Sequence, residues 1–421
     1  MQYGSAYKQG AERYICNLAQ ELKYLGNQVI VAGGDPNNIY SETPDFHLVS
    51  DQTRHYKLPT DHWSTITGAK PKQYIAFLKR LAPDIVHMIH PGHIGLALLS
   101  AAKTLGIKTI ITIVDFWWVC PKNTLIHHKH GLCSGNKRLE ECSECISQTH
   151  PSRNISRLLK YKPGSKVMRI GLMGKLVLKN HYNVWKKRSA IIEETLKSTD
   201  SIITLSATAE RLLKQHYPNI KTQKIPAGLH PRWYKNIYKW QPPQPKQKKI
   251  NIGFAGVIAP HKGLHILIEA LKRLPNDWFS LKVAGTCNDK NYQKKLNQLT
   301  RGLMISWQGS IDEEDMVEFI DRSDLIVVPS LSPENQPQVI LEGHARNTPI
   351  ICSDVPGCAE LVDKSLVYDA LSAERLANLL SSWKNKPFYK EGLKPISRAE
   401  AARRTESIYT NQPGDDLVSC S

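Results

Sequence analysis

The sequence predicts an α/β fold built from two doubly wound domains. Short apolar runs of β-forming residues alternate with segments of helical periodicity. The chain has 421 residues, which is enough for two hydrophobic cores. A segment rich in Pro, Gln and Lys at residues 240–249 is typical of a linker. We therefore expect one domain over residues 1–240 and a second over residues 250–395.

The first half opens with a polar, turn-rich stretch over residues 1–10, and a helical pattern follows. The strands expected in this half are at residues 28–32, 84–89, 109–114 and 201–206. The helices expected here are at residues 11–25, 94–105 and 207–216, with a further helix that ends near Leu81. This order predicts a parallel sheet covered by helices.

The second half repeats this alternation. The strands expected in it are at residues 250–255, 281–285, 304–308, 325–328, 349–354 and 365–368. The helices expected in it begin near Leu264 and span residues 291–299, 313–320, 337–347, 373–383 and 397–409. The pattern again predicts a doubly wound sheet.

Composition and charge restrict the class of protein and its partners. Hydrophobic residues make up 41% of the chain, yet no run of about 18 apolar residues occurs, so no transmembrane helix is expected. The sequence does not open with the apolar segment of a signal peptide, so we expect a cytoplasmic protein whose nine cysteines form no disulfides. The formal net charge of +18 favours polyanionic partners or an anionic membrane surface.

The most informative stretch runs from residue 325 to residue 360 and is expected to form a strand, a loop, a helix and a strand. Pro337 suits the first position of the helix, whose N-terminus would lie at the carboxyl edge of the sheet, where such sheets bind ligands. A phosphate is favoured there. Glu334 precedes the helix and Glu342 lies within it, so the two carboxylates could bind a sugar and a ribose. The alternative is a helix-terminal charge and a solvated glutamate.

Asp115 begins an Asp-Phe-Trp-Trp sequence directly after the strand expected at residues 109–114. At the carboxyl end of a parallel strand its carboxylate would face a ligand cleft and could accept hydrogen bonds from sugar hydroxyls. An aspartate that caps a helix or stabilises a turn is the alternative.

Four cysteines follow in a loop with little core of its own: Cys120, Cys133, Cys142 and Cys145. Four thiolates in such a loop suit a structural zinc ion that folds it. Nearby histidines could replace a thiolate: His127, His128 and His130. Thiols without a metal, a redox pair and an iron–sulfur site are the alternatives. A second histidine group, His87, His90 and His93, does not share one face, and no metal is expected there.

Residues 151–192 contain many Lys and Arg residues and no acidic residue, with apolar residues interleaved. This pattern suits an amphipathic segment that lies on anionic lipid. A solvated insertion is the alternative. No recognisable nucleic-acid-binding module accompanies the charge, so no nucleic-acid partner is expected.

Glu334 and Glu342, the strand that follows, and the turn from Gly357 to Glu360 together resemble the donor-binding signature of the retaining glycosyltransferases of family 4. The resemblance implies the GT-B fold, in which two Rossmann-like domains face a central cleft. The first domain would hold the acceptor and the second the nucleotide-sugar, with a C-terminal helix at residues 396–421 that returns to the first domain. The cysteine cluster in loop 116–150 is similar to that of one subgroup of the family.

The resemblance also implies roles for residues of the donor domain. Glu334 would bind sugar hydroxyls, and Glu342 would bind the ribose of the nucleotide. The N–H groups near Gln338 and Val339 would face the diphosphate.

The loop that begins at Gly256 resembles the family's Arg-x4-Lys-Gly loop, with Val257 at the position of the Arg. Its Lys262 would neutralise the departing diphosphate. Gly10 resembles the glycine of the family's first loop, which approaches the donor phosphate. The family places a buried strand before this loop, and the sequence ahead of Gly10 cannot supply it, so this strand is expected to be missing. Val114 stands where the family has His.

The sequence thus predicts a retaining glycosyltransferase that uses Glu334, Lys262 and Asp115 in catalysis and needs no cofactor for the reaction. Its expected partners are a nucleotide-sugar donor and a sugar or lipid-linked acceptor, in cell-envelope polysaccharide or glycolipid biosynthesis. It is expected in the cytoplasm, peripheral on the inner face of the membrane. The alternative is a catalytically impaired GT-B-fold protein that binds nucleotides without turnover.

Overall fold

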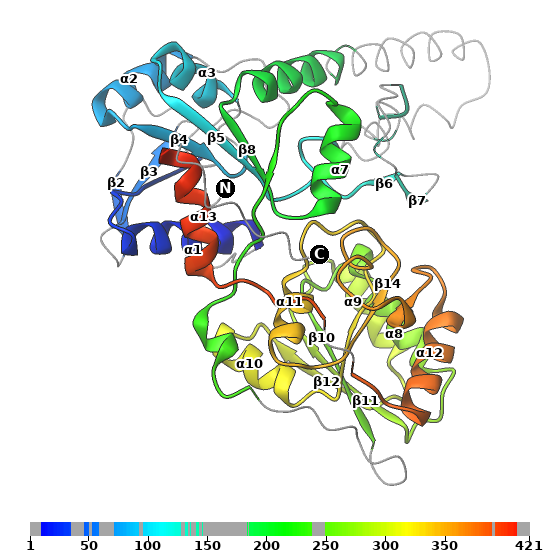
Figure 1. Cartoon of the computed structure of the whole chain (residues 1–421). Helices are drawn as coiled ribbons and strands as arrows, with labels where there is room; N and C mark the ends of the chain where they lie inside the picture. The colour runs from blue at the N-terminus through cyan, green and yellow to red at the C-terminus, as the bar shows by residue number, and fades with distance from the viewer. Residues whose placement is uncertain are drawn as a thin grey trace, which may run out of the picture. The chain divides into compact units, whose positions relative to one another are not determined.

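The computed structural model describes residues 10–34, 46–49, 53–58, 71–91, 96–127, 131–133, 135, 140–142, 145, 183, 185–237, 249–389 and 392–410. The chain divides into two compact units (Figure 1). Unit 1 comprises residues 1–225 and 402–421, and unit 2 comprises residues 226–401. The division falls at residue 225 and not at the Pro-rich segment 240–249, because Leu229 and Trp233 are already buried in the core of unit 2.

Unit 2 contains one parallel sheet of six strands, and every strand pair in it is parallel. In spatial order the strands are β12 (Ile305–Gly309), β11 (Phe279–Ala284), β10 (Ile250–Ala255), β13 (Leu325–Val328), β14 (Ile350–Ser353) and β15 (Val367–Tyr368). The chain order reverses direction across the sheet between β10 and β13. This switch point is where doubly wound sheets bind ligands.

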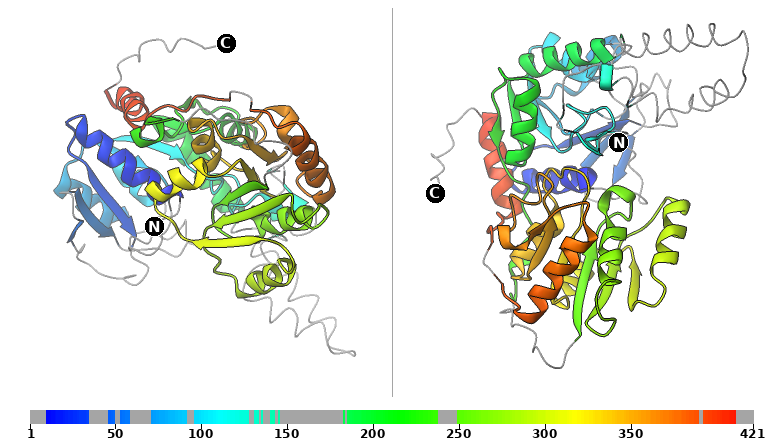
Figure 2. Two further views of the ribbon diagram at one scale, coloured as in Figure 1. Left: turned by 90° about the horizontal axis from the view of Figure 1, so that it is seen from below. Right: turned by 90° about the vertical axis from the view of Figure 1, so that its right-hand side faces the viewer.

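Five α-helices cover this sheet: α8 (Leu264–Leu271), α9 (Lys290–Leu299), α10 (Glu313–Asp321), α11 (Gln338–Ala345) and α12 (Ala373–Asn385). Helices α8, α9 and α12 pack together, and α10 packs against α11, with the sheet between the two groups (Figures 1 and 2). Side-chain caps begin several of them. For example, Asp289 accepts from the N–H groups of Asn291 and Tyr292 at the start of α9.

Burial explains why the sequence predicted the strands of unit 2 well. All four residues of β13 and of β14 are buried, since helices cover both faces. Continuous apolar runs of this kind are the signal of a central parallel strand. The helix predicted at residues 337–347 is shorter in the structure, because Asn347 adopts a left-handed conformation with φ of 57° and ends it.

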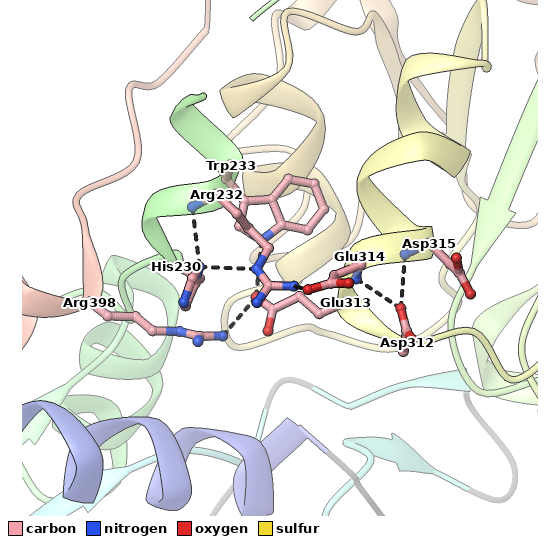
Figure 3. A network of polar contacts seen from close by, with 8 residues as sticks. All are labelled: His230, Arg232, Trp233, Asp312, Glu313, Glu314, Asp315 and Arg398. Atoms are coloured by element: carbon pink, nitrogen blue, oxygen red, sulfur yellow. Dashed lines mark hydrogen bonds and ion pairs between the residues drawn. The ribbon is translucent and has the colours of Figure 1, made fainter. Parts of the chain in front are cut away.

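The segments at the start and end of unit 2 run side by side and are fixed to helix α10 (Figure 3). Leu229 pairs with Ser397, and the 3-10 helix η1 (Pro231–Tyr234) follows. Glu313 Oε1 accepts from Trp233 Nε1 at 3.1 Å and from Arg398 Nη2 at 2.9 Å. One carboxylate therefore holds both segments to the first turn of α10 (Figure 3).

The described residues of unit 1 form two larger sheets. A parallel sheet of four strands has the order β4 (Ile85–Met88), β5 (Lys108–Ile113), β8 (Ser201–Thr204) and β9 (Gln223–Lys224). A three-stranded sheet has the order β1 (Ile30–Gly34), β3 (Thr53–Leu58) and β2 (Phe46–Val49). Strands β2 and β3 were not predicted, since their polar residues do not alternate cleanly with apolar ones. Two short strands, β6 (Ile126–His127) and β7 (Gly131–Leu132), pair antiparallel.

The helices of unit 1 are α1 (Gly10–Tyr24), α2 (Pro71–Leu81), α3 (Ala97–Thr104), α7 (Ala207–His216) and a helix over residues 185–198. Residues 402–410 of α13 (Arg398–Thr410) also belong to this unit. Lys108 Nζ donates to the carbonyl oxygens of Ile408 and Tyr409 at 2.7 and 2.9 Å. The strand that the sequence predicted to be missing would precede residue 10, and residues 1–9 lie outside the described residues.

Within the described part of the chain, none of the helices has the length and apolar character needed to span a bilayer.

Candidate active site

Two loops meet at the switch point of the sheet in unit 2. The first follows β10 over residues 256–263, and the second follows β13 over residues 329–337. The N–H group of Leu331 donates to the carbonyl oxygen of His261 at 2.8 Å and joins the loops. Because β10 and β13 are adjacent parallel strands, side chains from both loops gather at one edge of the sheet.

Lys262 and Glu334, which the sequence predicted as site residues, are brought together here. Lys262 Nζ lies 2.6 Å from Glu334 Oε1, and the two side chains are 28% and 15% exposed. The hydroxyl of Ser330 donates to the same oxygen at 2.7 Å. Both donors therefore use one oxygen of the carboxylate.

Glycines allow the backbones of these loops to pack tightly. Gly263 has φ of +69°, and a Cβ added to it would lie 1.7 Å from the carbonyl oxygen of Pro329. Gly357 has φ of +88°, and its added Cβ would lie 1.7 Å from the carbonyl oxygen of Glu334. No residue with a side chain fits at either position. Gly357 thus fixes the backbone that carries Glu334.

Helix α11 begins beside this pair. Its N-cap residue, Pro337, supplies no side-chain cap. The N–H groups of Gln338 and Val339 are in the first turn, where no intrahelical acceptor is available. The side chain of Gln336 is used elsewhere, since its Oε1 accepts from the N–H of Ala227 at 2.8 Å. The helix start can therefore bind an anion.

Glu342, predicted to bind a ribose, lies within α11 and is 2% exposed. The alternative of a solvated glutamate is therefore wrong.

Gly256 follows β10 with φ of +145°, and no described atom lies within 4 Å of the position of an added Cβ. The neighbouring Val257 is 47% exposed.

In unit 1, Asp115 follows β5, and three protein groups contact its carboxylate. Its Oδ1 accepts from the N–H of Trp117 at 3.0 Å, and its Oδ2 accepts from Asn123 Nδ2 at 3.0 Å. His90 Nε2 lies 3.0 Å from Oδ2. Burial raises the pKa of Asp115, but the hydrogen bond and charge of His90 and the other donors outweigh it and hold this pKa below its usual value. The bond to Trp117 N–H matches the turn alternative.

Sequence reasoning did not select His90 as a partner of Asp115. The signal was present, because His90 follows β4, and β4 is the parallel neighbour of β5.

His87 has a different role. Its Nδ1 lies 2.6 Å from Tyr409 Oη and its Nε2 lies 2.7 Å from Thr112 Oγ1. Burial lowers its pKa to about 3. His93 lies outside the described residues.

Gly10 is the first residue of α1, and nothing described lies within 4 Å of an added Cβ there. Gly10 and Asp115 belong to unit 1, whereas the other predicted binding and catalytic residues belong to unit 2.

The four clustered cysteines lie near enough to one another for their thiols to interact electrostatically. Burial raises the pKa of Cys142 to about 12, with further contributions from the nearby thiols of Cys120, Cys133 and Cys145. No disulfide joins the described cysteines. Over the described residues, no three His, Cys, Asp or Glu side chains are arranged to hold a metal ion. His128 and His130 lie outside the described residues.

Most of the basic segment 151–192 also lies outside the described residues. Three of its basic residues are described: Lys186 and Lys187 are exposed, and Arg188 is 8% exposed. Its Nη2 donates to the carbonyl oxygen of Trp117, and its guanidinium carbon lies 4.4 Å from the centre of the Trp117 ring. This cation holds the loop after β5 and does not form part of an open basic surface.

Comparison with known families gives two matches. A model described as "Glycosyl transferases group 1" matches residues 236–402, and one described as "Glycosyltransferase Family 4" matches residues 8–138. Together these matches support a GT-B glycosyltransferase, as the sequence predicted.

Curated relatives match over part of their length. The O-antigen chain mannosyltransferase RfbU of Salmonella typhimurium is 23% identical over 182 residues, which are 42% of this chain and 49% of that protein. The putative teichuronic acid biosynthesis glycosyltransferase TuaC of Bacillus subtilis is 27% identical over 139 residues, which are 32% of this chain and 33% of that protein. The chain thus spans between a third and a half of these relatives.

Solved structures show the fold. A glycosyltransferase from Rickettsia africae has a TM-score of 0.60 at 17% identity, with 96% of each chain covered. Anabaena HepE in complex with UDP-glucose has a TM-score of 0.59 at 14% identity, with 97% of this chain and 95% of that chain covered. The fold is GT-B, with an α/β unit and a parallel sheet on each side of residue 225. The predicted fold class is confirmed.

Proposed function

We propose that this chain transfers a sugar from a nucleotide-sugar to an acceptor hydroxyl with retention of configuration. One observation carries the proposal: Lys262 and Glu334 lie 2.6 Å apart at the β10–β13 switch point, beside the start of α11. A diphosphate needs positive charge and N–H donors, and a sugar needs hydrogen-bond acceptors. These groups are present within two adjoining loops.

In this proposal Lys262 and the first N–H groups of α11 bind the diphosphate, and Glu334 binds hydroxyls of the sugar. Glu342 binds the ribose once the donor has displaced the groups that bury it. The bond between C1 of the sugar and the phosphate oxygen breaks, and a bond from C1 to the acceptor oxygen forms. The proton of the acceptor hydroxyl leaves with the diphosphate. Stabilising that leaving group is the main task of Lys262.

Retention rests on the resemblance to family 4. The same resemblance implied a catalytic role for Asp115, but both of its oxygens accept from protein donors, so we propose that Asp115 mainly holds its loop at the acceptor side. Asp115 and His90 would face the acceptor at the carboxyl edge of the sheet in unit 1, since ligands bind at that edge. Gly10, at the start of α1, would approach the donor phosphate.

The acceptor class follows from the relatives. RfbU is named as an O-antigen chain mannosyltransferase, and TuaC is named as a putative glycosyltransferase of teichuronic acid biosynthesis. We therefore propose a sugar or lipid-linked acceptor in cell-envelope polysaccharide or glycolipid biosynthesis. An anionic membrane surface would suit the net charge of +18. Sedimentation with vesicles that contain 30% phosphatidylglycerol, compared with phosphatidylcholine vesicles, tests this surface.

The proposed function is tested with a panel of UDP-glucose, UDP-galactose, UDP-N-acetylglucosamine and GDP-mannose. UDP-glucose comes first because HepE binds it. The expected result is a rise in melting temperature with one donor and release of its nucleoside diphosphate, which Glu334→Gln slows about 10- to 100-fold. Glu374→Gln is the matched control, because Glu374 is exposed at the start of α12. No stabilisation and no release with any donor would contradict the proposal.

A binding protein without turnover is the second candidate, and exposed Val257 favours it, since the family has a cation there. It would give stabilisation without release of the diphosphate, and Glu334→Gln would then have no rate to lower.

Structural zinc in the cysteine cluster also remains a proposal. No catalytic step depends on it. Elemental analysis of the purified protein is expected to give one zinc per chain in the wild type and less in Cys142→Ser. A wild-type protein without zinc would contradict this.

A further inference from the structure

The carboxylate of Glu334 is held on one side only. A carboxylate has two oxygens that can together accept about four hydrogen bonds. Lys262 Nζ and Ser330 Oγ both donate to Oε1, at 2.6 and 2.7 Å. Among the described residues, Oε2 has no hydrogen-bond partner. The carboxylate thus has one oxygen with protein donors and one that can accept from a ligand.

The two donors differ in how firmly they are fixed. Lys262 is an ammonium on a flexible four-carbon stem and is 28% exposed. Ser330 is 2% exposed and directly follows the strand β13 and Pro329. Its backbone is held in turn, because the hydroxyl of Ser353, at the end of β14, donates to the carbonyl oxygen of Ser330 at 2.6 Å. The serine therefore fixes the orientation of the carboxylate more strongly than the lysine does.

Donor binding would change the balance between them. In the proposed function Lys262 serves the diphosphate, whose negative charge competes with Glu334 for the ammonium. Once Lys262 turns to the diphosphate, Ser330 is the remaining described donor to Oε1. The orientation of Glu334 in the complex then depends on this one hydroxyl.

We propose that Ser330 is a positioning residue, which holds Oε1 of Glu334 so that Oε2 accepts a hydroxyl of the donor sugar. This inference rests on the proposed function and adds a residue to it. Ser330 would act on the sugar half of the donor and not on the nucleotide half. A residue with only a structural role would weaken the binding of both halves together.

The test compares the dissociation constant of UDP-glucose with that of UDP. If the wild type uses another donor of the panel, that nucleotide-sugar and its nucleoside diphosphate are compared instead. We expect Ser330→Ala to weaken nucleotide-sugar binding about 10- to 100-fold, as for loss of one bond to a charged group, and to leave diphosphate binding within about twofold. Ser330→Thr keeps the hydroxyl and is expected to restore most of the affinity.

Ser332→Ala is the matched control. Ser332 is a serine of the same loop, is 3% exposed, and makes no hydrogen bond to Glu334 in the described structure. It is expected to leave both dissociation constants unchanged. If Ser330→Ala weakens diphosphate and nucleotide-sugar equally, or weakens neither, the inference is overturned while the proposed function stands. A wild type that binds no donor overturns both.

A double-mutant cycle gives a second test that does not depend on the stability of Ser330→Ala alone. In a Glu334→Ala background the serine has no carboxylate to hold. Adding Ser330→Ala is then expected to change nucleotide-sugar affinity less than about twofold. A further loss as large as that in the wild-type background would show that Ser330 acts through some other group.

Discussion

The two units each contain a carboxylate paired with a cationic or potentially cationic side chain, and the two pairs have similar positions in their sheets. In unit 2, Lys262 follows β10 and Glu334 follows β13, the parallel neighbour of β10. In unit 1, His90 follows β4 and Asp115 follows β5, the parallel neighbour of β4. Each pair joins the carboxyl ends of adjacent parallel strands, where ligands bind in such folds.

The two pairs differ in how many oxygens of the carboxylate already accept hydrogen bonds from protein donors. Both oxygens of Asp115 accept from protein donors, Oδ1 from Trp117 N–H and Oδ2 from Asn123 and His90. Glu334 uses Oε1 alone among the described residues. The position of a carboxylate therefore identifies a candidate site, and its remaining hydrogen-bonding capacity separates a ligand-binding carboxylate from one that mainly stabilises its own loop.

The largest expected effect is on the cation of the unit 2 pair. Lys262→Ala removes the side chain that would neutralise the leaving diphosphate, so we expect the rate of diphosphate release to fall about 100- to 1,000-fold. Lys272→Ala, at an exposed position directly after α8, is the control and is expected to keep the wild-type rate. If Lys262→Ala lowers the rate of diphosphate release by less than about threefold, Lys262 does not stabilise the leaving diphosphate.

The next effect concerns the backbone that supports Glu334. Gly357→Ala would place a methyl group against the carbonyl oxygen of Glu334, whereas Gly302→Ala, at φ of +82°, meets no described atom within 4 Å. Gly302→Ala is expected to cost about 1–2 kcal/mol of unfolding free energy from backbone strain alone. Gly357→Ala is expected to cost more and also to abolish donor binding. Equal costs in urea unfolding would contradict the close packing seen here.

The carboxylate of unit 1 should behave in the opposite way to Glu334. Asp115→Asn removes one acceptor and sets an amide N–H against existing donors, so we expect about 1–3 kcal/mol of destabilisation. Diphosphate release should change less than about tenfold. Measured side by side, Asp115→Asn should lower the melting temperature more than Glu334→Gln does. A large rate loss with unchanged stability would instead make Asp115 a catalytic group.

A pH effect is expected in unit 1 as well. Burial lowers the pKa of His87 from its ordinary value of 6.5 to about 3. Between these values the unfolded chain binds more protons than the folded chain, so stability rises with pH and is lost as pH falls. The slope is at most about 1.4 kcal/mol per pH unit. Urea unfolding between pH 7 and pH 4.5 should show a weaker pH dependence in His87→Gln, and parallel profiles would contradict this.

Unit 2 was largely predictable from the sequence because its sheet is covered on both faces. Its central strands are continuous apolar runs, and the spacing of Glu334, Glu342 and Gly357 is a local property of a loop, a helix and a turn. The meeting of Lys262 with Glu334 was not predicted, because it requires knowing that β10 and β13 are neighbours. What no local pattern contains is the hydrogen bond from Ser330 or the burial of Glu342.

Unit 1 was less predictable because its features depend on tertiary contacts. The pairing of His90 with Asp115 requires knowing that β4 and β5 are neighbours. Arg188 was read as part of a basic surface, yet its guanidinium packs on Trp117, which is distant in sequence. The compact units divide at residue 225 for a similar reason, since Trp233 is buried in unit 2 ahead of the Pro-rich segment.

The most direct test of the comparison is the affinity for UDP-glucose relative to the affinity for UDP. Both are measured by calorimetry in the wild type, Glu334→Gln and Asp115→Asn. If the panel identifies another donor, that donor and its nucleoside diphosphate are used instead. The account predicts that the additional affinity contributed by the sugar disappears in Glu334→Gln and is kept in Asp115→Asn. If Glu334→Gln keeps this additional affinity, or if Asp115→Asn alone loses it, the account is contradicted.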